Sequence, residues 1–461
     1  MKFTTRTHGE EQPYWKFGPF KVRLPFIHYR WEFVETVQSL ILIVIGLSMV
    51  PLLQQYLGLP YEVAIGYVIV CAFGFMLPAL LGVPMVPGWI TPAIPVVLMF
   101  IGDFEPGAEA IQALFAVQFV VFAIFFLLGV TGLGSRLIQM IPNSVQAGVI
   151  MGAGIAALIG ELEEGGRLAS TPISITIGAA ISIFLLFSVA CQKWISEYRW
   201  VKQIANYGIL PGMTVGIFVA WGIGEYPLPD IEWGFTSPDF AGMWNYLPFT
   251  VGFPSLEVFA LAIPTAVVAY IIAFGDILVG RSLMERADKM RPDEKIDYSV
   301  SRVHLVTALR NLLHAFLAPY PGLAGPIFTA GTATIAERYK YGPKAMDSIF
   351  SGAGTIMIAA FIGIFFLPLV TLFQPVLPIA LSLTLVLTGY ICLMVGMDRI
   401  QSPAERGVAG TMAVIMAIYG AGWGLAAGLF LYLVVEKSNF FGRERTVDQA
   451  PRQVAQTEGA D

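Results

Sequence analysis

Long apolar stretches follow one another along the chain, with short polar segments between them. Most of them approach the ~20 residues that a helix needs to cross the hydrocarbon core of a bilayer. The pattern therefore predicts an all-α polytopic membrane protein. The apolar stretches cover residues 34–54, 62–82, 86–101, 109–131, 141–160, 171–191, 204–223, 256–280, 303–319, 326–337, 346–370, 376–397 and 404–436.

One segment, 82–95, reads GVPMVPGWITPAIP and breaks the helical pattern, although apolar residues flank it on both sides. Proline lacks a backbone donor and clashes with the preceding turn, so its prolines prevent a continuous helix. Within a membrane, non-helical backbone survives only where protein or a water-filled cavity satisfies its polar groups. We therefore expect a broken helix that lines a binding site.

The composition supports a membrane location. Hydrophobic residues make up 56% of the chain and charged residues only 13%, whereas a soluble domain carries about 25% charged residues. Cys71, Cys191 and Cys392 all lie in apolar stretches without metal-ligand spacing, which is typical of packing residues. No nucleophile–base pair or His/Asp/Cys cluster occurs at helical spacing. We expect no enzyme, no metal or other cofactor, and no nucleic-acid partner.

The distribution of basic residues orients the chain. With a cytoplasmic N-terminus, 25 of the 27 Lys and Arg residues fall in the cytoplasm, and Arg167 and Arg310 are the two exceptions. This result requires 404–436 to be a hairpin of two short helices, which gives 14 transmembrane segments and a cytoplasmic C-terminus. A count of 12 or 13 would place the basic C-terminal tail outside. We expect an integral plasma membrane protein, in a bacterial inner membrane.

Two segments of the chain resemble each other. Gly88 opens the sextet GWITPA and Gly325 opens GPIFTA, and nearly the same spacing separates Pro142 from Pro378. Two landmarks with one spacing predict a 7+7 inverted repeat with broken half-helices at segments 3 and 10. The expected domains are a cytoplasmic N-terminal arm with an amphipathic segment (1–33), the first repeat (34–224), an extracytoplasmic loop (225–255), the second repeat (256–436) and a cytoplasmic tail (437–461).

Several motifs, spread over nearly the whole membrane portion, carry a family resemblance. They are Val37-Gln38-Ser39 in the first span, Ile141-Pro142 with Val145, Gly148 and Gly152 in the fifth, Gly275-Asp276 in the eighth, and the Pro/Gly break and Thr-bearing half-helix within 310–331. Together with the closing hairpin at 407–435, they resemble the superfamily of nucleobase–ascorbate (uracil/xanthine) permeases, sulfate permeases and bicarbonate transporters.

This resemblance implies a secondary transporter with a mobile core subdomain, a gate subdomain and a homodimer, and a site between spans 1, 3, 8 and 10. The chain differs from the nucleobase permeases at important positions. Ile272 stands where their substrate-binding glutamate is expected, and Ser39 replaces a histidine. The C-terminal regulatory domain common in sulfate permeases is also missing. We therefore interpret the chain as a divergent member.

In the fold that the resemblance implies, the two broken segments meet near the bilayer midplane. The half-helix ends then direct N–H groups and partial positive charge toward one place, which suits an anion or a carbonyl-rich ring. Tryptophan is also common in packing, and threonine often bonds its own helix, so both residue types have structural alternatives. The candidate substrate-binding residues are Gln38, Gly88, Trp89, Ile90, Thr91, Ile272, Asp276, Arg310, Gly325, Phe328, Thr329 and Thr332.

Arg310 is the sharpest single signal. It lies roughly 10 Å along its helix from the cytoplasmic end, where a charge is costly and usually functional and paired. Asp276 is a plausible partner, and His314 lies one turn further on the same face. Alternatively, Arg310 extends to the cytoplasmic interface. Asp276 is also the candidate for binding a coupling H⁺ or Na⁺, unless it pairs with Arg281.

These features favour a secondary active transporter. We expect H⁺- or Na⁺-coupled uptake of a small anionic solute by alternating access, because Arg310 is present and Ile272 replaces the glutamate. A nucleobase symporter of the uracil/xanthine type is the first alternative. A passive anion channel is the alternative from another class, and it differs in being unable to accumulate solute against a gradient.

Overall fold

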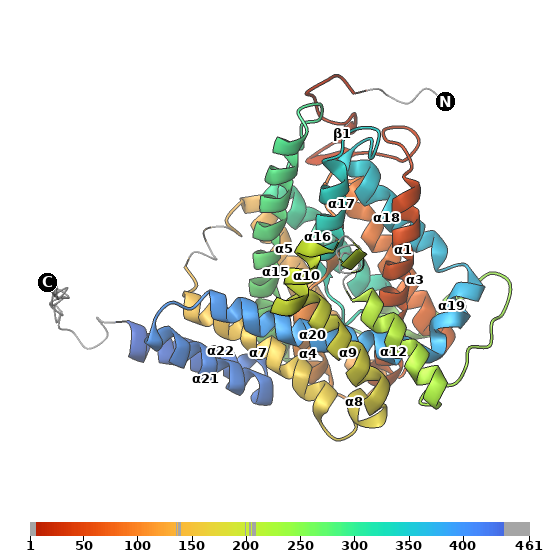
Figure 1. Ribbon diagram of the computed structural model, residues 1–461. Helices are drawn as coiled ribbons and strands as arrows, with labels where there is room; N and C mark the ends of the chain where they lie inside the picture. Colours follow the sequence, from red (N-terminus) through yellow and green to blue (C-terminus); the bar gives the residue numbers. More distant parts are fainter. Residues whose placement is uncertain are drawn as a thin grey trace, which may run out of the picture.

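Two groups of helices that cross each other build the protein in the computed structural model (Figure 1). The structure describes residues 6–437 except 135, 137–139, 199, 202–203 and 205–208. The first residues of the expected arm and the expected tail beyond residue 437 therefore lie outside the described part.

The helices of each group come from both expected halves of the chain. The first group consists of α1 (Phe33–Leu47), α3 (Tyr61–Leu80), α5 (Ala108–Thr131), α15 (Leu256–Met290), α16 (Val300–Leu317), α17 (Thr329–Tyr339) and α18 (Ile349–Gly363). The second consists of α7 (Asn143–Leu162), α9 (Pro172–Phe187), α12 (Leu210–Ile223), α20 (Leu377–Asp398), α21 (Pro403–Tyr419) and α22 (Ala421–Leu431). Helices α1 and α18, α3 and α16, and α5 and α16 pack within the first group, whereas α7 packs against α20 and α21 in the second.

Short elements lie between and beyond these helices. They are α2 (Val50–Leu57), α4 (Ile94–Ile101), α8 (Arg167–Ser170), α10 (Val189–Glu197), α13 (Phe240–Met243), α14 (Pro248–Val251), α19 (Leu367–Phe373), three 3₁₀ helices, η1 (Thr91–Ala93), η2 (Trp244–Tyr246) and η3 (Gln374–Val376), and a final π-helical turn η4 (Tyr432–Glu436). The strands are β1 (Trp15–Phe17), β2 (Phe20–Val22), β3 (Gly88–Trp89) and β4 (Ala324–Gly325).

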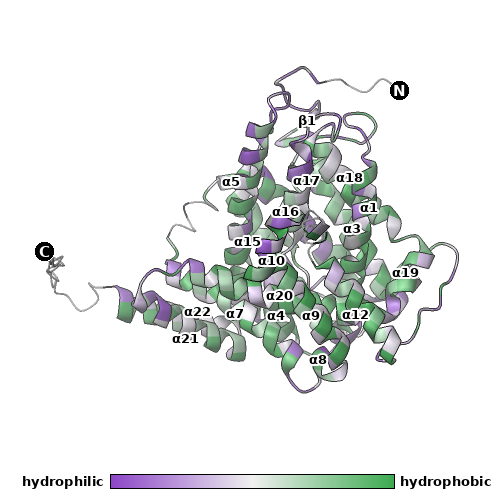
Figure 2. Cartoon of the chain, in the orientation of Figure 1, coloured by the Kyte–Doolittle hydropathy of each residue, from purple (hydrophilic) through white to green (hydrophobic). Residues whose placement is uncertain are grey.

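The apolar helices support an integral membrane protein, as the hydropathy colouring shows (Figure 2). Within the described residues, six helices are long and apolar enough to cross a bilayer, or seven if the pair Pro172–Phe187 and Val189–Ile195, bent by 61°, forms one span. Four shorter apolar helices accompany them: Thr91–Ile101, Leu210–Ile223, Ile349–Gly363 and Ala421–Glu436. The count of 14 segments stays a prediction.

The last apolar stretch, 404–436, folds as two helices. Pro403 occupies the first turn of α21 and Ser402 forms a capping box with Glu405, which fixes where the helix begins. Gly420 ends it with φ 87°, a conformation that glycine adopts readily, and α22 follows directly. The two helices pack against each other as the hairpin that the charge distribution requires.

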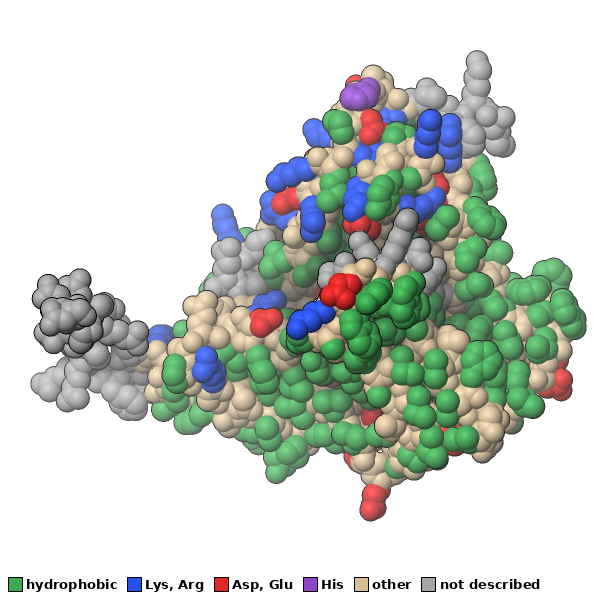
Figure 3. Space-filling model, viewed as in Figure 1, with side chains coloured by type: hydrophobic (Ala, Val, Ile, Leu, Met, Phe, Trp, Pro, Cys, Tyr) green, Lys and Arg blue, Asp and Glu red, His purple; other side chains and the backbone are tan. Residues whose placement is uncertain are grey.

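The N-terminal arm forms a small hairpin of β1 and β2 at one end of the molecule. Many Lys and Arg side chains gather on the same end (Figure 3). The arm is attached to the segment after α15, because Arg6 pairs with Asp293 at 2.7 Å and Lys21 with Asp297 at 2.6 Å. Hydrogen bonds from Arg291, and the nearby Arg6, lower the pKa of Asp293 to about 2. Contact of this arm with the membrane surface stays a prediction.

Candidate substrate site

The two broken segments meet in a short antiparallel strand pair. Gly88 lies opposite Gly325, and Trp89 lies opposite Ala324. The pairing continues beyond the strands, where the Ile90 amide donates to the Leu323 carbonyl at 2.9 Å. The similarity between the two sextets therefore corresponds to a contact between them in the fold.

Both glycines are required by the close approach of the strands. A Cβ added at Gly88 would lie 2.6 Å from the Ile327 carbonyl oxygen, and one at Gly325 would lie 2.7 Å from the carbonyl carbon of Trp89. Real Cβ atoms essentially never approach backbone atoms so closely. Glycine permits this crossing because it has no side chain.

A short helix begins directly after each strand. Thr91 starts η1, which continues as α4, and Thr329 starts α17. Pro92 and Pro95 occupy the first turns of η1 and α4, where an amide donor is not required. The N-terminal ends of both helices carry partial positive charge and lie beside the strand pair.

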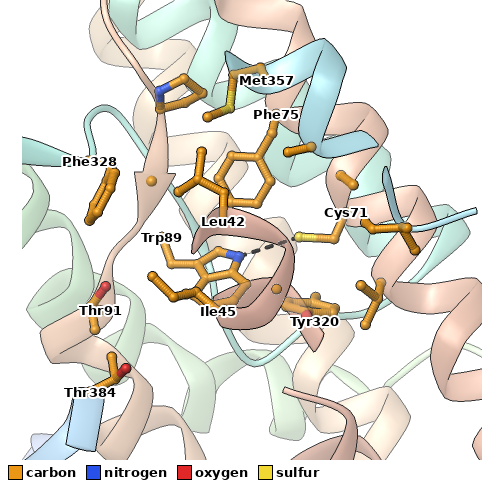
Figure 4. Close-up of a pocket in the computed structure, with 17 residues that line it drawn as sticks. Leu42, Ile45, Cys71, Phe75, Trp89, Thr91, Tyr320, Phe328, Met357 and Thr384 are labelled. Atoms are coloured by element: carbon orange, nitrogen blue, oxygen red, sulfur yellow. Dashed lines mark hydrogen bonds between the residues drawn. The ribbon is translucent and has the colours of Figure 1, made fainter. Parts of the chain in front are cut away.

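A cavity of about 110 Å³ lies against the strand pair, between α1, α3 and α18 (Figure 4). Its wall is mainly apolar and aromatic, and the hydroxyl groups of Thr91 and Thr384 add polar character. Thr384 belongs to α20, so the second group of helices also reaches the cavity. Other labelled wall residues are Leu42, Ile45, Cys71, Phe75, Trp89, Tyr320, Phe328 and Met357.

Trp89 is held firmly in the cavity wall. Its indole Nε1 donates to the Cys71 sulfur at 3.3 Å, and its ring lies 5.9 Å from Phe75 and 5.8 Å from Tyr320. A Cβ at Gly322 would lie 3.0 Å from the indole. Trp89 therefore presents a fixed aromatic face to the cavity, and its contact with a substrate stays a prediction.

Arg310 lies immediately behind this wall and is fully buried. Its guanidinium donates to the Gly325 carbonyl at 2.6 Å and to the Gly88 carbonyl at 3.2 Å, so it joins the two strands from behind. The guanidinium carbon lies 4.7 Å from the ring centroid of Phe75. The guanidinium of Arg310 therefore points to the strand pair and does not extend to the cytoplasmic interface.

The predicted ion pair between Arg310 and Asp276 is wrong. The charge that acts on Asp276 is that of Arg399, at the end of α20. The Arg399 Nη2 would lie 3.1 Å from a Cβ at Gly275, and its Nη1 donates to Gln146 at 2.9 Å. Asp276 therefore lies on the side of α15 that faces α20 of the second group.

The alternative partner for Asp276 is also wrong, because Arg281 pairs with Glu285 one turn along α15, at 2.7 Å. Among the described residues, Arg310 itself makes no salt bridge with a carboxylate. Its charge is therefore compensated only by carbonyl oxygens and by the aromatic ring of Phe75.

The other predicted residues divide into three sets. Gly88, Trp89, Thr91 and Phe328 line the cavity, and Gly325 and Ile90 shape its backbone. Thr332 is buried and bonds both the amide and the carbonyl of Val86, so it holds the broken segment in place. The remaining three do not line this cavity: Thr329 is exposed and Ile272 is buried in α15. Gln38 lines a separate cavity of about 460 Å³ between α1 and α12.

Cys71 and Phe75 are wall residues that the sequence analysis did not identify. Both face the cavity from α3, one turn apart. Their spacing is the ordinary i, i+4 pattern of any buried helix face, so it does not distinguish a ligand-facing position from packing. Only the position of Trp89, which bonds Cys71, shows which face of α3 lines the site.

Solved structures share this fold. The chain superposes on the transmembrane domain of BicA, a bicarbonate transporter of a cyanobacterium, with a TM-score of 0.52 and 15% identity, covering 86% of this chain and 96% of that one. It also matches SLC26A9 (TM-score 0.51, 15% identity, 87% and 64% covered) and murine Slc26a9, an anion transporter in its inward-facing state (TM-score 0.51, 13% identity, 87% and 67% covered). At these identities the likeness establishes the fold.

A search of curated proteins finds no match to this chain. A family model of permeases (Xan_ur_permease) matches residues 32–300, which is more than half of the chain and includes α1, α3, the first broken segment and α15. A structure with several apolar helices and the fold of membrane transporters agrees with that match. The chain therefore belongs to the Permease family and is a membrane transporter.

Proposed function

We propose that this protein takes up a small anion with an apolar body, driven by a gradient of H⁺ or Na⁺. The solute binds in the cavity beside the strand pair, with its apolar part against Trp89 and its negative charge toward the strands. The name of one similar structure describes a bicarbonate transporter and that of another an anion transporter, which supports an anionic substrate.

The observation that carries the proposal is the buried charge of Arg310. A buried charge without a counter-charge is costly, and functional charges in membranes are usually paired. Arg310 is fully buried, lies one residue layer behind the cavity wall and has no carboxylate partner among the described residues. An anion in the cavity would compensate this charge, and the low polarity of the wall would strengthen the attraction.

The two groups of helices support transport by alternating access. The cavity wall belongs almost entirely to the first group, and Thr384 of the second group closes one side. We propose that the first group moves as the core and carries the solute past a stationary second group. In this proposal the chain forms 14 transmembrane segments in two inverted repeats, with both termini in the cytoplasm, and assembles as a homodimer in the plasma membrane.

A nucleobase is the second candidate solute. The family match and the aromatic rings of Phe75, Trp89 and Tyr320 favour a flat ring, since aromatic faces stack on nucleobases. The glutamate that would bind such a ring in related permeases is Ile272 here, and Ile272 does not reach the cavity. The two candidates therefore differ in the charge of the solute.

Uptake into proteoliposomes tests the proposal. Benzenesulfonate represents an anion with an apolar body, sulfate a fully polar anion and uracil a neutral ring. We expect accumulation of benzenesulfonate above its external concentration under an imposed H⁺ or Na⁺ gradient. Accumulation of uracil alone would favour the nucleobase symporter. Movement of anions that never exceeds equilibrium would indicate a passive channel.

Variants of Arg310 separate its charge from its hydrogen bonds. Arg310→Gln removes the charge, whereas Arg310→Lys keeps it but replaces the guanidinium that bonds both strands. We expect the Gln variant to lose uptake of benzenesulfonate, and the Lys variant to keep a measurable part of it. Thermal unfolding in the absence of solute measures how much stability each variant has lost. Unchanged uptake by the Gln variant would remove Arg310 from the site.

A further inference from the structure

Two buried histidines on α16 have contrasting surroundings. The ring of His304 is fully bonded: its Nδ1 lies 2.9 Å from the Val300 carbonyl and its Nε2 lies 3.1 Å from the Tyr270 hydroxyl. The ring of His314 is also fully buried, but its one polar partner is the Cys71 carbonyl, so at least one ring nitrogen has no hydrogen-bond partner among the described residues. Leaving a buried polar group unpaired costs about 1–3 kcal/mol, so this nitrogen calls for a functional explanation.

Other unpaired polar atoms lie around the same histidine. The hydroxyl of Tyr320, the side-chain amide nitrogen of Gln118 and Nε of Arg310 are all buried without a hydrogen-bond partner among the described residues. The rings of His314 and Tyr320 are 6.1 Å apart, and the Gln118 side-chain oxygen accepts from the Tyr320 amide at 3.0 Å. These contacts gather three uncharged polar groups, here called the His314 cluster: His314, Tyr320 and Gln118.

The fold makes room for the His314 ring. A Cβ at Gly74 would lie 2.7 Å from the ring Nε2, so α3 admits the imidazole only because residue 74 is glycine. The cluster is continuous with the substrate cavity through Tyr320, whose ring lines the cavity and lies 5.8 Å from that of Trp89. Figure 4 shows Tyr320 beside Cys71 and Trp89 in that wall.

The charges around His314 favour protonation only when an anion is bound. Its own helix contributes Arg310, α3 contributes the Cys71 carbonyl, and the segment before β4 contributes the Tyr320 ring, whose backbone amide bonds the uncharged Gln118 of α5. No acidic side chain of the described residues acts on the ring. An imidazolium there would be a second buried cation beside Arg310, and an anion in the cavity would lower the cost of that added charge.

We propose that the His314 cluster is the proton-binding site of the transporter, with His314 as the group that takes up the coupling H⁺. A proton from the loading side forms the second ring N–H bond as the anion enters, so an anion and a proton move together. On the other side of the membrane the same N–H bond breaks, the anion leaves and the proton returns to water. Tyr320 and Gln118 position the ring and connect it to the cavity. This inference rests on the proposed function and selects H⁺ over Na⁺ as the coupling ion.

Proteoliposomes with an imposed pH gradient and no Na⁺ test the proposal with benzenesulfonate, which keeps its charge at every pH used. We expect His314→Gln to lower the accumulation driven by the pH gradient at least tenfold, and to abolish the proton uptake that accompanies benzenesulfonate entry. Exchange of internal for external benzenesulfonate, which needs no gradient, should fall only a few-fold. His304→Gln is the matched control on the same helix and should keep the coupling of the unmodified protein.

A second readout covers the case in which His314→Gln does not fold. Tyr320→Phe removes one polar atom of the cluster and should shift the pH dependence of accumulation without abolishing exchange. If His314→Gln accumulates benzenesulfonate with protons like the unmodified protein, or if the unmodified protein takes up no protons, His314 is not the proton-binding site. Either result would leave the proposed transport of the anion unaffected. If the unmodified protein accumulates no benzenesulfonate under either gradient, the proposed function itself is wrong.

Discussion

The two broken segments share a backbone but differ in what their side chains do. Both place a glycine at the strand crossing and both continue as a short helix. The first segment then presents Trp89 and Thr91 to the cavity. From the second segment Phe328 reaches the cavity, while Thr329 is exposed, and Tyr320 lines the cavity from the residues just before β4. The two segments therefore share their backbone geometry, and in the proposed function the first carries most of the recognition.

The largest effect is expected where the two segments are equivalent. Gly88→Ala and Gly325→Ala should each destabilise the protein by about 3 kcal/mol, because the new Cβ would clash with backbone of the opposite segment. Both variants should also lose solute binding. Thermal unfolding of the purified protein, with and without benzenesulfonate, measures both effects.

Gly410→Ala is the matched control for these variants. Gly410 lies within α21 and a Cβ there would meet no atom within 4 Å. Alanine is the better helix former, so this change should leave stability equal or slightly higher. If either crossing glycine tolerates alanine as Gly410 does, the close contact between the two segments is wrong.

The sequence was sufficient to predict the broken segments, and the family resemblance implied that they meet. Prolines and glycines mark such places through local backbone chemistry, which a single sequence displays directly. The partner of Arg310 could not be predicted in the same way. Its bonds go to the carbonyls of Gly88 and Gly325, and any residue offers a carbonyl.

Asp276 is a second residue whose partner could not be predicted from the sequence. Its position in the sequence suggested a pair with Arg310, since both lie in neighbouring spans of the second half. The rotation of α15 about its axis instead turns Asp276 toward Arg399, and that rotation depends on how α15 packs, mainly against α5 and α17. Gln38 and Ile272, which the family resemblance suggested, do not line this cavity either.

An intermediate effect on solute binding is expected when the aromatic residues of the two segments are replaced. Trp89→Ala should weaken the binding of benzenesulfonate about 30-fold, because it removes a buried aromatic face that contacts Phe75 and Tyr320. Phe328→Ala should weaken the binding of benzenesulfonate only about fivefold, since the Phe328 ring is half-buried and comes from the second segment. Isothermal titration measures the dissociation constant of each variant for benzenesulfonate. Equal losses of affinity would contradict the asymmetry between the segments.

The smallest effect concerns the first hydroxyl of each short helix. Thr91→Val keeps the shape of the side chain but removes a hydroxyl from a cavity wall with few polar groups, so the dissociation constant for benzenesulfonate should rise about threefold to tenfold. Thr329→Val removes the corresponding hydroxyl at the start of α17, which is exposed and outside the cavity, and should leave the constant unchanged. Because each threonine is the first residue of its helix and neither helix has a side-chain cap bond, a general effect of valine on the helix start would be alike in the two variants. A difference confined to Thr91 would therefore assign recognition to the first segment, and a matching loss at Thr329 would show that both half-helix ends contact the solute.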